Sequence, residues 1–392
     1  MISPHFYAAT SGRRSSSRSR HKAPKVLWAS MAIIGLAVAG CGTATETPTA
    51  ASSSSVAVTS ETSSAPASTS SSAAAESMSS SAAETSAAMS SEEVSASAPG
   101  MEGGSATPVT PVLSITNADG TEITFDKIPE RIVCLTGLCD DVLFELGLVP
   151  VGTSTPGLLA LPEYLGAESA SITSITGSFG GEDVESIAAL TPDLVVGLAG
   201  AHDQMSPSVV QFAPLLLLDV TSYEDSISYL RSFGALLDKA DEQVIAENSF
   251  NASLAKAREA SSAGGLKKMK ALTMYASGGG TGVNTSDDLL GGLMSEIFEY
   301  PWPNKGGGWD TAQAYSTEEI LAVNPDIIFI QSFTADAAAP KYSQELADNP
   351  VWSRIAAVQS GKVIEVDTAL WTAGRGPRAL SLVLDEAVAA AS

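Results

Sequence analysis

Short apolar runs alternate with stretches of helical spacing over most of the chain after residue 111. Mostly apolar runs at 131–136, 194–198 and 327–331 predict buried β-strands. Where apolar residues recur every three or four positions, as at 227–237, the pattern predicts a helix with one buried face. We also expect a helix at 343–358. Such alternation of short strands with helices is typical of parallel sheets that helices cover on both faces.

One sequence motif occurs twice, at 185–196 and at 318–329. Each copy begins with Glu, continues with Ile and Ala at matching positions, reaches a Pro-Asp pair and ends in an apolar run. The motif predicts a short helix, a tight turn and a buried strand. Its duplication indicates two related α/β halves.

The segment between the two copies, 223–264, is predicted to be helical almost throughout. Its apolar residues fall into two sets, 227–244 and 246–257, that do not share one register, so a kink or break near 239–246 remains open. Gly264-Gly265 should end the helix. We therefore expect an N-terminal α/β lobe at 109–222, a helical connector at 223–264 and a C-terminal α/β lobe at 265–392.

The residues before the first lobe have a different character. Residues 1–40 hold six Lys and Arg residues and no acidic residue, and an apolar run follows the basic residues at 26–40. This run is shorter than the roughly 20 residues that span a bilayer, so we expect 1–40 to be a signal peptide. The ending Val38-Ala39-Gly40-Cys41 resembles the lipobox of bacterial lipoproteins, which implies a lipid on Cys41. An ordinary secretory signal is the alternative. Residues 41–108 are nearly all Ser, Ala, Thr, Glu and Pro and predict a disordered tether.

Charge and histidine content exclude several classes of ligand. The formal charge of the whole chain is −23, and removal of the six basic residues in 1–40 from the total of 21 leaves 15 against 44 acidic ones. Such a surface should repel nucleic acid and anionic lipid headgroups. His202 is the only histidine after residue 40. Because a bare Zn or Mn site needs several His and carboxylate ligands, we expect no direct metal site.

The ordered set of motifs in 112–392 resembles one family. The motifs are the paired Glu-x-Ile…Pro-Asp segments, Pro129-Glu-Arg-Ile-Val133, Asn349-Pro-Val-Trp352 and Leu384-Asp385. They are similar, in this order, to those of the iron-siderophore, cobalamin and haem class of solute-binding proteins, which feed ABC importers. The resemblance implies an α/β fold of two Rossmann-like lobes with parallel sheets, joined by one long rigid α-helix, with the ligand cleft between the lobes.

The resemblance also implies a function. The protein would be a monomeric, lipid-anchored receptor on the outer face of the cytoplasmic membrane, would lack a cofactor and would not be an enzyme. Its cargo would be a ferric siderophore of the hydroxamate or citrate type, with haem or cobalamin as alternatives. Its partner would be an ABC permease dimer with a cytoplasmic ATPase.

Two other functions remain open. A lipoprotein that senses the same ligand and signals to a membrane partner would have the same sequence features. A secreted hydrolase is the second alternative, although the chain has no Gly-x-Ser-x-Gly elbow, Walker loop or dinucleotide fingerprint.

Ligands of open parallel sheets bind beyond the carboxyl ends of the strands, which nominates the loops there. Aromatic faces can pack on the organic skeleton of a chelate, and a guanidinium can make bidentate bonds to carboxylate or hydroxamate oxygens. Core packing is the alternative for the tryptophans, and an exposed first-turn position is the alternative for Arg378. The candidate cleft residues are Phe179, His202, Tyr275, Trp302, Trp309, Trp371, Arg375 and Arg378.

Two pairs of residues carry separate hypotheses. His202 and Tyr275 could ligate haem iron from facing lobes, and the alternative for His202 is a solvated loop position. Cys134 and Cys139 lie close in sequence in an oxidising compartment, where they could form a disulfide or remain two buried thiols.

Glu185 and Glu318 open the two copies of the repeated motif. In the family that the chain resembles, one acidic residue on each lobe docks into arginine pockets of the permease, and these two occupy matching places. The alternative is that both are acids in a first helical turn, where the helix dipole favours them.

Overall fold

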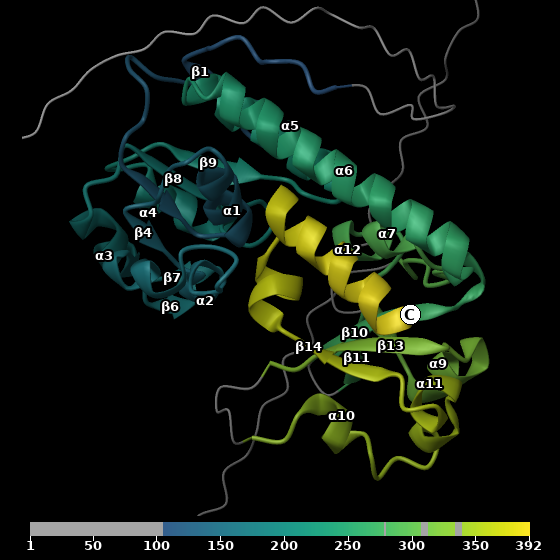
Figure 1. The fold of residues 1–392 in the computed structure, drawn as a ribbon. Coiled ribbons are helices and arrows are strands. Elements are labelled where there is room, and N and C mark those ends of the chain that lie inside the picture. The colour runs from purple at the N-terminus through teal and green to yellow at the C-terminus, as the bar shows by residue number, and fades with distance from the viewer. Residues whose placement is uncertain (1–104, 278–279, 307–312, 334–338) are drawn as a thin grey trace, which may run out of the picture. The chain divides into compact units, whose positions relative to one another are not determined.

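The sheet of the N-terminal lobe has five strands in the order β5-β4-β3-β8-β9, and every neighbouring pair is parallel. Figure 1 shows β4, β8 and β9 of this sheet together in the N-terminal lobe. The computed structural model describes residues 105–277, 280–306, 313–333 and 339–392. Two antiparallel hairpins, β1-β2 and β6-β7, accompany this sheet. The strands are β1 Ser114–Thr116, β2 Glu122–Thr124, β3 Ile132–Cys134, β4 Gly152–Thr153, β5 Thr173–Ser174, β6 Gly177–Ser178, β7 Gly181–Glu182, β8 Leu194–Leu198 and β9 Leu215–Leu218.

Helices cover both faces of this sheet, because its central strands are apolar on both sides. In β8, Leu194 and Val196 pack in the same cluster as side chains of α1, whereas Val195 packs in a second cluster with α3 and α4. Successive side chains of a strand point to opposite faces, so a continuous apolar run buries the strand completely. The helices of this lobe are α1 Gly137–Glu145, α2 Pro156–Leu159, η1 Gly166–Ser171, α3 Val184–Ala189, η2 Asp203–Met205 and α4 Ser206–Val209.

The C-terminal lobe has a mixed sheet in the order β12-β11-β10-β13-β14. Strands β10, β13 and β14 are parallel, and β11 is antiparallel to both β10 and β12. The parallel pairing of β10, β13 and β14 agrees with the expected α/β fold with parallel sheets, and β11 and β12 extend this sheet by an antiparallel edge. The short link between β10 and β11 cannot hold the crossover that a parallel pair needs. The elements are β10 Ala271–Ser277, β11 Gly280–Val283, α7 Leu289–Ser295, β12 Ala314–Tyr315, α9 Thr317–Val323, β13 Ile327–Gln331, β14 Val363–Val366, η5 Ala369–Ala373 and α12 Pro377–Ala391.

The single helix expected at 343–358 is wrong. The segment contains three short pieces: α10 (Tyr342–Glu345), η4 (Trp352–Arg354) and α11 (Ala356–Gln359). The side-chain oxygen of Asn349 accepts the backbone N–H of Val351 at 2.8 Å, which favours a turn over a helix. A proline follows Asn349 and restricts its backbone to extended conformations.

The connector consists of two helices, α5 (Tyr223–Leu236) and α6 (Ala240–Gly264), that pack antiparallel. The Tyr223 ring, at the start of α5, lies 5.9 Å from the Phe250 ring in α6. The chain reverses at Asp238, which has a left-handed φ of 54°. The change in apolar register therefore reflects a reversal of the chain immediately before α6.

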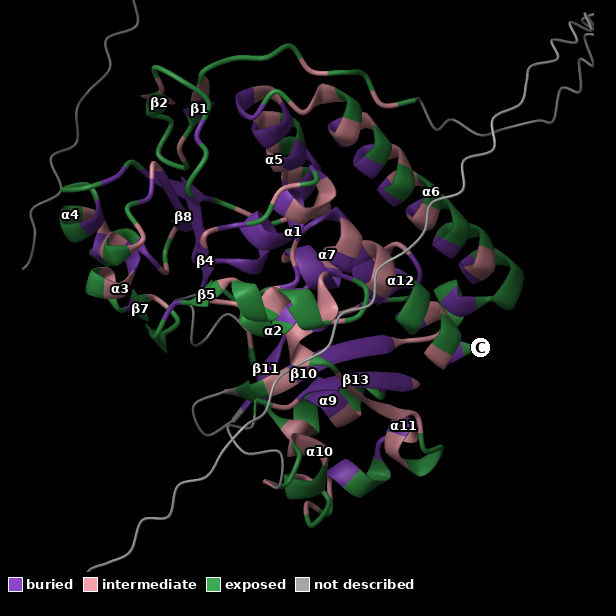
Figure 2. Cartoon of the chain, turned by 60° about the vertical axis from the view of Figure 1, so that its left-hand side comes forward, coloured by how far each residue is buried: buried purple, intermediate pink, exposed green. Residues whose placement is uncertain are grey.

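Helix α6 alone is the long helix that joins the lobes. Its length is about 37 Å at 1.5 Å per residue. Ala246, near its start, packs in the core of the N-terminal lobe, and Phe250 and Leu254 pack in the core of the C-terminal lobe. Figure 2 shows that β8 and β13 are buried, whereas parts of α6 face solvent.

No helix in the described part of the chain combines the length and the hydrophobicity that a membrane span requires.

Candidate functional site

The carboxyl edges of the two sheets face each other. Gly137, the first residue of α1 after β3, lies so close to the segment after β14 that an added Cβ would be 2.1 Å from the carbonyl oxygen of Ala373. A Cβ on Gly157, in α2 after β4, would lie 3.5 Å from the Cβ of Ala369. The loops where ligands of such sheets bind therefore meet at one place in the molecule.

A buried carboxylate links the two lobes at this edge. Asp141 on α1 accepts hydrogen bonds from the backbone N–H groups of Arg378 at 3.2 Å and Ala379 at 2.8 Å, and from the hydroxyl of Tyr164. It thereby caps the first turn of α12 from the opposite lobe. Burial raises the pKa of Asp141 to about 7, against the lowering effect of these hydrogen bonds.

Arg378 belongs to this contact between the lobes, so its prediction as a ligand-binding residue is not supported by its position. Its Nε donates to Oε1 of Glu145 on α1 at 2.6 Å, and its guanidinium lies 4.8 Å from the centre of the Phe144 ring. Side chains of the N-terminal lobe therefore already bind the Arg378 guanidinium, which we expected to face a ligand. The fixed geometry of the α1–α12 contact, which the sequence does not reveal, is the reason.

Arg375, in the loop between η5 and α12, remains available to a ligand. Its carbonyl oxygen accepts from the hydroxyl of Ser226 at 2.7 Å, which fixes the loop against α5. Its side chain is half-buried, and within the described residues its guanidinium makes no hydrogen bond and no ion pair. Burial lowers the pKa of Arg375, against the opposite effect of the Asp288 carboxylate. A guanidinium is a charged group with several N–H donors, and one whose donors have no partner among the described residues favours an anionic ligand group.

Polar side chains near Arg375 form a chain of hydrogen bonds. Gln331, at the end of β13, donates to the Asn284 side-chain oxygen at 2.9 Å and accepts from the hydroxyl of Thr372. Asp288 caps α7 by accepting the backbone N–H of Gly291 in its first turn, and it also accepts the backbone N–H of Thr285, which precedes the helix. Burial raises the pKa of Asp288 to about 6, although these bonds and the charge of Arg375 act in the opposite direction. We did not single out Asp288, because a helix N-cap gives no sequence signal of a ligand site.

Exposed aromatic rings lie after strands of both lobes. Phe333 follows β13 and is 53% exposed, and its ring lies 6.4 Å from that of Tyr275. Phe179, at the tip of the β6-β7 hairpin, is 65% exposed. The Tyr275 hydroxyl donates to Gln313, and burial raises the pKa of Tyr275 to about 12, so it stays a neutral phenol.

Two of the candidate tryptophans are core residues. Trp302 is fully buried, and its Nε1 donates to the carbonyl of Ala271 at the amino end of β10, away from the carboxyl edge. Trp371 is 3% exposed and stacks on Phe329 at 4.9 Å. Core packing, the alternative that we kept open, is therefore what the structure shows for both. Trp309 lies outside the described residues.

His202 is fully buried, so a role as an axial haem ligand is not compatible with its position. Its Nδ1 accepts the backbone N–H of Leu198 at 2.9 Å, and its Nε2 lies 3.3 Å from Oε1 of Glu182. The solvated loop position that we considered as the alternative is also wrong. Both ring nitrogens are already occupied by groups of the protein.

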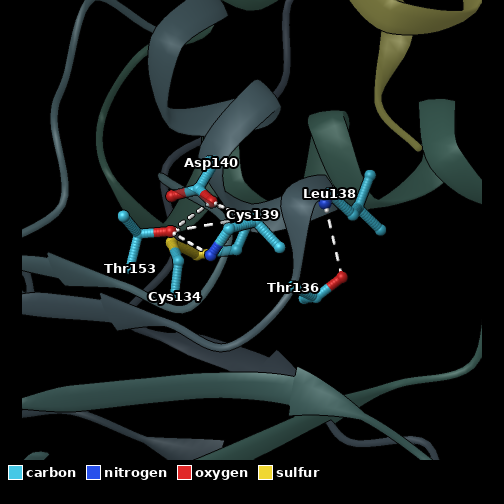
Figure 3. Close-up of a disulfide and its surroundings, with 7 residues drawn as sticks. Cys134, Thr136, Leu138, Cys139, Asp140 and Thr153 are labelled. Atoms are coloured by element: carbon cyan, nitrogen blue, oxygen red, sulfur yellow. Dashed lines mark hydrogen bonds between the residues drawn. A yellow bond between two sulfur atoms is a disulfide. The ribbon is translucent and has the colours of Figure 1, made fainter. Parts of the chain in front are cut away.

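The structure joins Cys134 and Cys139 in a disulfide across the turn from β3 into α1 (Figure 3). Beside it, the Asp140 carboxylate accepts hydrogen bonds from the hydroxyls of Thr153, at 2.6 Å, and Thr155. The other Asp140 oxygen is buried without a hydrogen-bond partner among the described residues. The covalent link thus lies in the turn that carries Asp141 and Gly137 to the opposite lobe.

Glu185 and Glu318 are exposed residues in the first turns of α3 and α9, one on each lobe. The structure therefore leaves both proposed roles open to them. Cys41 lies outside the described residues. No group of three or more His, Cys, Asp or Glu side chains in the described part of the chain is arranged to hold a metal ion.

Two surface pockets lie away from the edge where the lobes meet. One of about 420 Å³ is at the amino ends of the C-terminal strands, next to Lys268 and Lys362. The other, of about 360 Å³, lies beside the end of α5, next to Val112 and Leu236. Neither contains the charged and aromatic residues described above.

Comparison with known proteins gives a consistent result. The sequence profile of the periplasmic binding protein family matches residues 132–370. The Fe(3+)-citrate-binding protein YfmC of Bacillus subtilis (strain 168) is 26% identical over 263 residues, which are 64% of this chain and 78% of YfmC. The Fe(3+) dicitrate-binding periplasmic protein FecB of Escherichia coli (strain K12) is 25% identical over 259 residues, 64% of this chain and 82% of FecB.

A solved structure has the same fold. The crystal structure of Staphylococcus aureus SirA complexed with staphyloferrin B superimposes with a TM-score of 0.57 at 21% sequence identity. The match covers 71% of this chain and 98% of SirA.

Proposed function

Because the chain belongs to the periplasmic binding protein family, we propose that it captures a ferric siderophore of the hydroxamate or citrate type and delivers it to an ABC importer. Members of this family bind solutes outside the cytoplasm and do not transform them. The curated relatives above carry names that refer to ferric citrate. These names support a chelate as the proposed cargo.

The half-buried guanidinium of Arg375 is the observation that supports this function most directly. It lies at the carboxyl edge with no hydrogen-bond partner among the described residues, so binding an anionic oxygen there would not break an existing ion pair. Carboxylate and hydroxamate oxygens match the planar fork of a guanidinium. The exposed rings of Phe179 and Phe333 supply apolar surface for the organic part of the chelate.

Removal of the Arg375 side chain tests this function. We expect Arg375→Ala to weaken the binding of ferric citrate or a ferric trihydroxamate by about ten- to a hundredfold, since a hydrogen bond to a charged group contributes about 1.5–3 kcal/mol. Isothermal titration calorimetry against both chelates and haem measures the effect. Arg354→Ala, which removes an exposed arginine of the same lobe, is the matched control. Equal affinities of the two variants would contradict the assignment of Arg375.

Haem is the weaker candidate for the cargo. The fully buried His202 already has partners at both ring nitrogens, and the Tyr275 hydroxyl donates to Gln313. Neither side chain is a free axial ligand, so a haem-only response in the titration would contradict this ranking.

For delivery, we propose that Glu185 and Glu318 dock on the two halves of a permease dimer. Both carboxylates are exposed in first helical turns of corresponding motifs in the two lobes. One charge on each lobe suits a partner with two similar subunits, and the same pair would serve a sensing partner only if that partner were also a dimer.

For the location, we propose that the protein is a monomer held by a lipid on Cys41 to the outer face of the cytoplasmic membrane. The lipobox-like sequence before Cys41 supports this anchor. Replacement of Cys41 by Ala should release the protein from the membrane fraction, whereas release of the unaltered protein would contradict the anchor.

A further inference from the structure

The contacts of His202 connect two segments of the N-terminal lobe. His202 follows β8 and is fully buried, and its ring fits there because residue 197 is glycine: an added Cβ would lie 2.9 Å from the His202 Cγ. Nδ1 accepts the N–H of Leu198 at 2.9 Å. Nδ1 also lies 3.2 Å from the carbonyl oxygen of Leu198. The tautomer with its proton on Nε2 keeps the bond from the Leu198 N–H and directs this proton at the Glu182 carboxylate, 3.3 Å away.

Glu182 connects His202 to the β6-β7 hairpin. It is the last residue of β7 and is 5% exposed. Its Oε1 also accepts the backbone N–H of Gly180 in the hairpin turn at 3.3 Å, and its Oε2 is buried with no partner among the described residues. A buried carboxylate with an unpaired oxygen costs stability, so stability alone does not explain this pair.

The same contacts determine where the Phe179 ring lies. The ring meets the edge of the His202 ring at 5.2 Å with an interplanar angle of 80°. The next residue, Gly180, has a φ of 76°, and an added Cβ there would lie 2.8 Å from the carbonyl oxygen of Ala201. The hairpin tip is thus held against the segment 201–202, while Phe179 itself stays 65% exposed.

We propose that His202 and Glu182 are positioning residues for ligand recognition: together they hold the β6-β7 hairpin so that Phe179 presents its ring to the cargo. This inference rests on the proposed function, because it assumes a ligand that packs against Phe179. The pair acts through Phe179 and does not touch the cargo, since both of its side chains are buried.

A double-mutant cycle tests the inference. His202→Asn retains a polar atom near the Leu198 amide but cannot reach Glu182, and Phe179→Ala removes the ring. We expect each variant to weaken ferric citrate binding about tenfold, and the double variant to be no weaker than either single one, because both changes remove the same contact. Phe212→Ala, at another half-exposed phenylalanine of this lobe, should bind as the unaltered protein does.

A second measurement does not need a ligand. Amide hydrogen exchange of residues 177–182 should be faster in His202→Asn and in Glu182→Gln than in the unaltered protein, with the exchange of residues 194–197 of β8 unchanged. Glu182→Gln keeps the shape of the side chain and serves where His202→Asn does not fold.

The two measurements separate this inference from the proposed function. If Arg375→Ala abolishes binding while His202→Asn changes neither affinity nor exchange at 177–182, the positioning role is wrong and the function stands. Additive losses in the cycle would also overturn the role. If the unaltered protein binds no chelate, the proposed function fails and the role of the pair in recognition is overturned with it. Faster exchange at 177–182 in the variants would then still show that the pair holds the hairpin.

Discussion

At the scale of the residue, Asp140 shows how burial sets the properties of a side chain. It is fully buried beside the disulfide, with one carboxylate oxygen bonded to two threonine hydroxyls and the other without a partner among the described residues. Burial raises its pKa to about 7, the threonine hydroxyls oppose this, and the charge of Asp141 adds to it. The folded protein therefore holds a proton that the unfolded chain, with an ordinary Asp pKa near 3.8, has lost.

The sign of the resulting pH dependence follows from this difference. Between about pH 4 and pH 7 the folded state binds more protons at Asp140 than the unfolded state does, so this group's contribution to the unfolding free energy falls as the pH rises. We expect Asp140→Asn, which cannot ionise, to lose less stability than the unaltered protein between pH 4 and pH 8. Calorimetric melting at both pH values measures this difference.

The control for this prediction is Asp241→Asn, which removes an exposed carboxylate of α6. It should leave the pH dependence of the melting temperature unchanged. If Asp140→Asn lowered the melting temperature by the same amount at pH 4 and pH 8, its carboxylate would be ionised throughout and the assigned pKa would be wrong.

At the scale of the element, glycines allow α1 and α2 to approach the segment after β14. A Cβ on Gly137 would lie 2.1 Å from a carbonyl oxygen, and a backbone atom cannot move away without moving the lobe that carries it. At Gly157 the corresponding Cβ would make an ordinary contact of 3.5 Å with a side chain. The two positions thus differ only in whether the structure has space for one methyl group.

This difference gives a matched pair of variants. We expect Gly137→Ala to lower the unfolding free energy by about 1–3 kcal/mol, the usual effect of overpacking, and Gly157→Ala to change it by less than about 1 kcal/mol. Urea denaturation monitored by circular dichroism provides both values. Similar effects of the two substitutions would mean that α1 does not pack as closely on the other lobe as the structure indicates.

At the scale of the whole molecule, two contacts fix the lobes relative to each other. Helix α6 passes from one core to the other, and Asp141 together with the Arg378–Glu145 ion pair joins α1 to α12. A receptor with two such links should present surface charges on its lobes at nearly constant spacing. This constant spacing supports our proposal that Glu185 and Glu318 form one docking surface for a dimeric permease.

Charge reversal at both positions tests the docking surface. The double variant Glu185→Arg/Glu318→Arg should reduce cellular uptake of ferric citrate at least tenfold while its affinity for the chelate stays the same, because the charges lie outside the ligand site. Uptake of radioactive iron and calorimetry measure the two quantities. The control Glu168→Arg/Glu345→Arg reverses one exposed carboxylate on each lobe. Equal uptake by both double variants would refute the docking role.

The outcomes for single residues show which sequence signals are reliable. Strands β8 and β13 occur where apolar runs predict them, because a strand that is covered on both faces buries every side chain of such a run. Trp302 and Trp371 are core residues although they flank the nominated loops, because an indole gains as much from burial in a core as from a ligand. Sequence pattern cannot distinguish these two uses of a large aromatic ring.

The sequence by itself determined the apolar strands, the duplicated α/β motif and the helical segment between the two copies, since these depend on local spacing and on burial that any compact fold must provide. Only the tertiary structure decided that α5 folds back on α6, that Arg378 is bound to Glu145 while Arg375 has no hydrogen-bond partner among the described residues, and that His202 is buried against Glu182. The physical reason is that the burial and the hydrogen bonds of a polar side chain depend on partners that are distant in the chain. The positions of these partners are fixed only when the elements pack together.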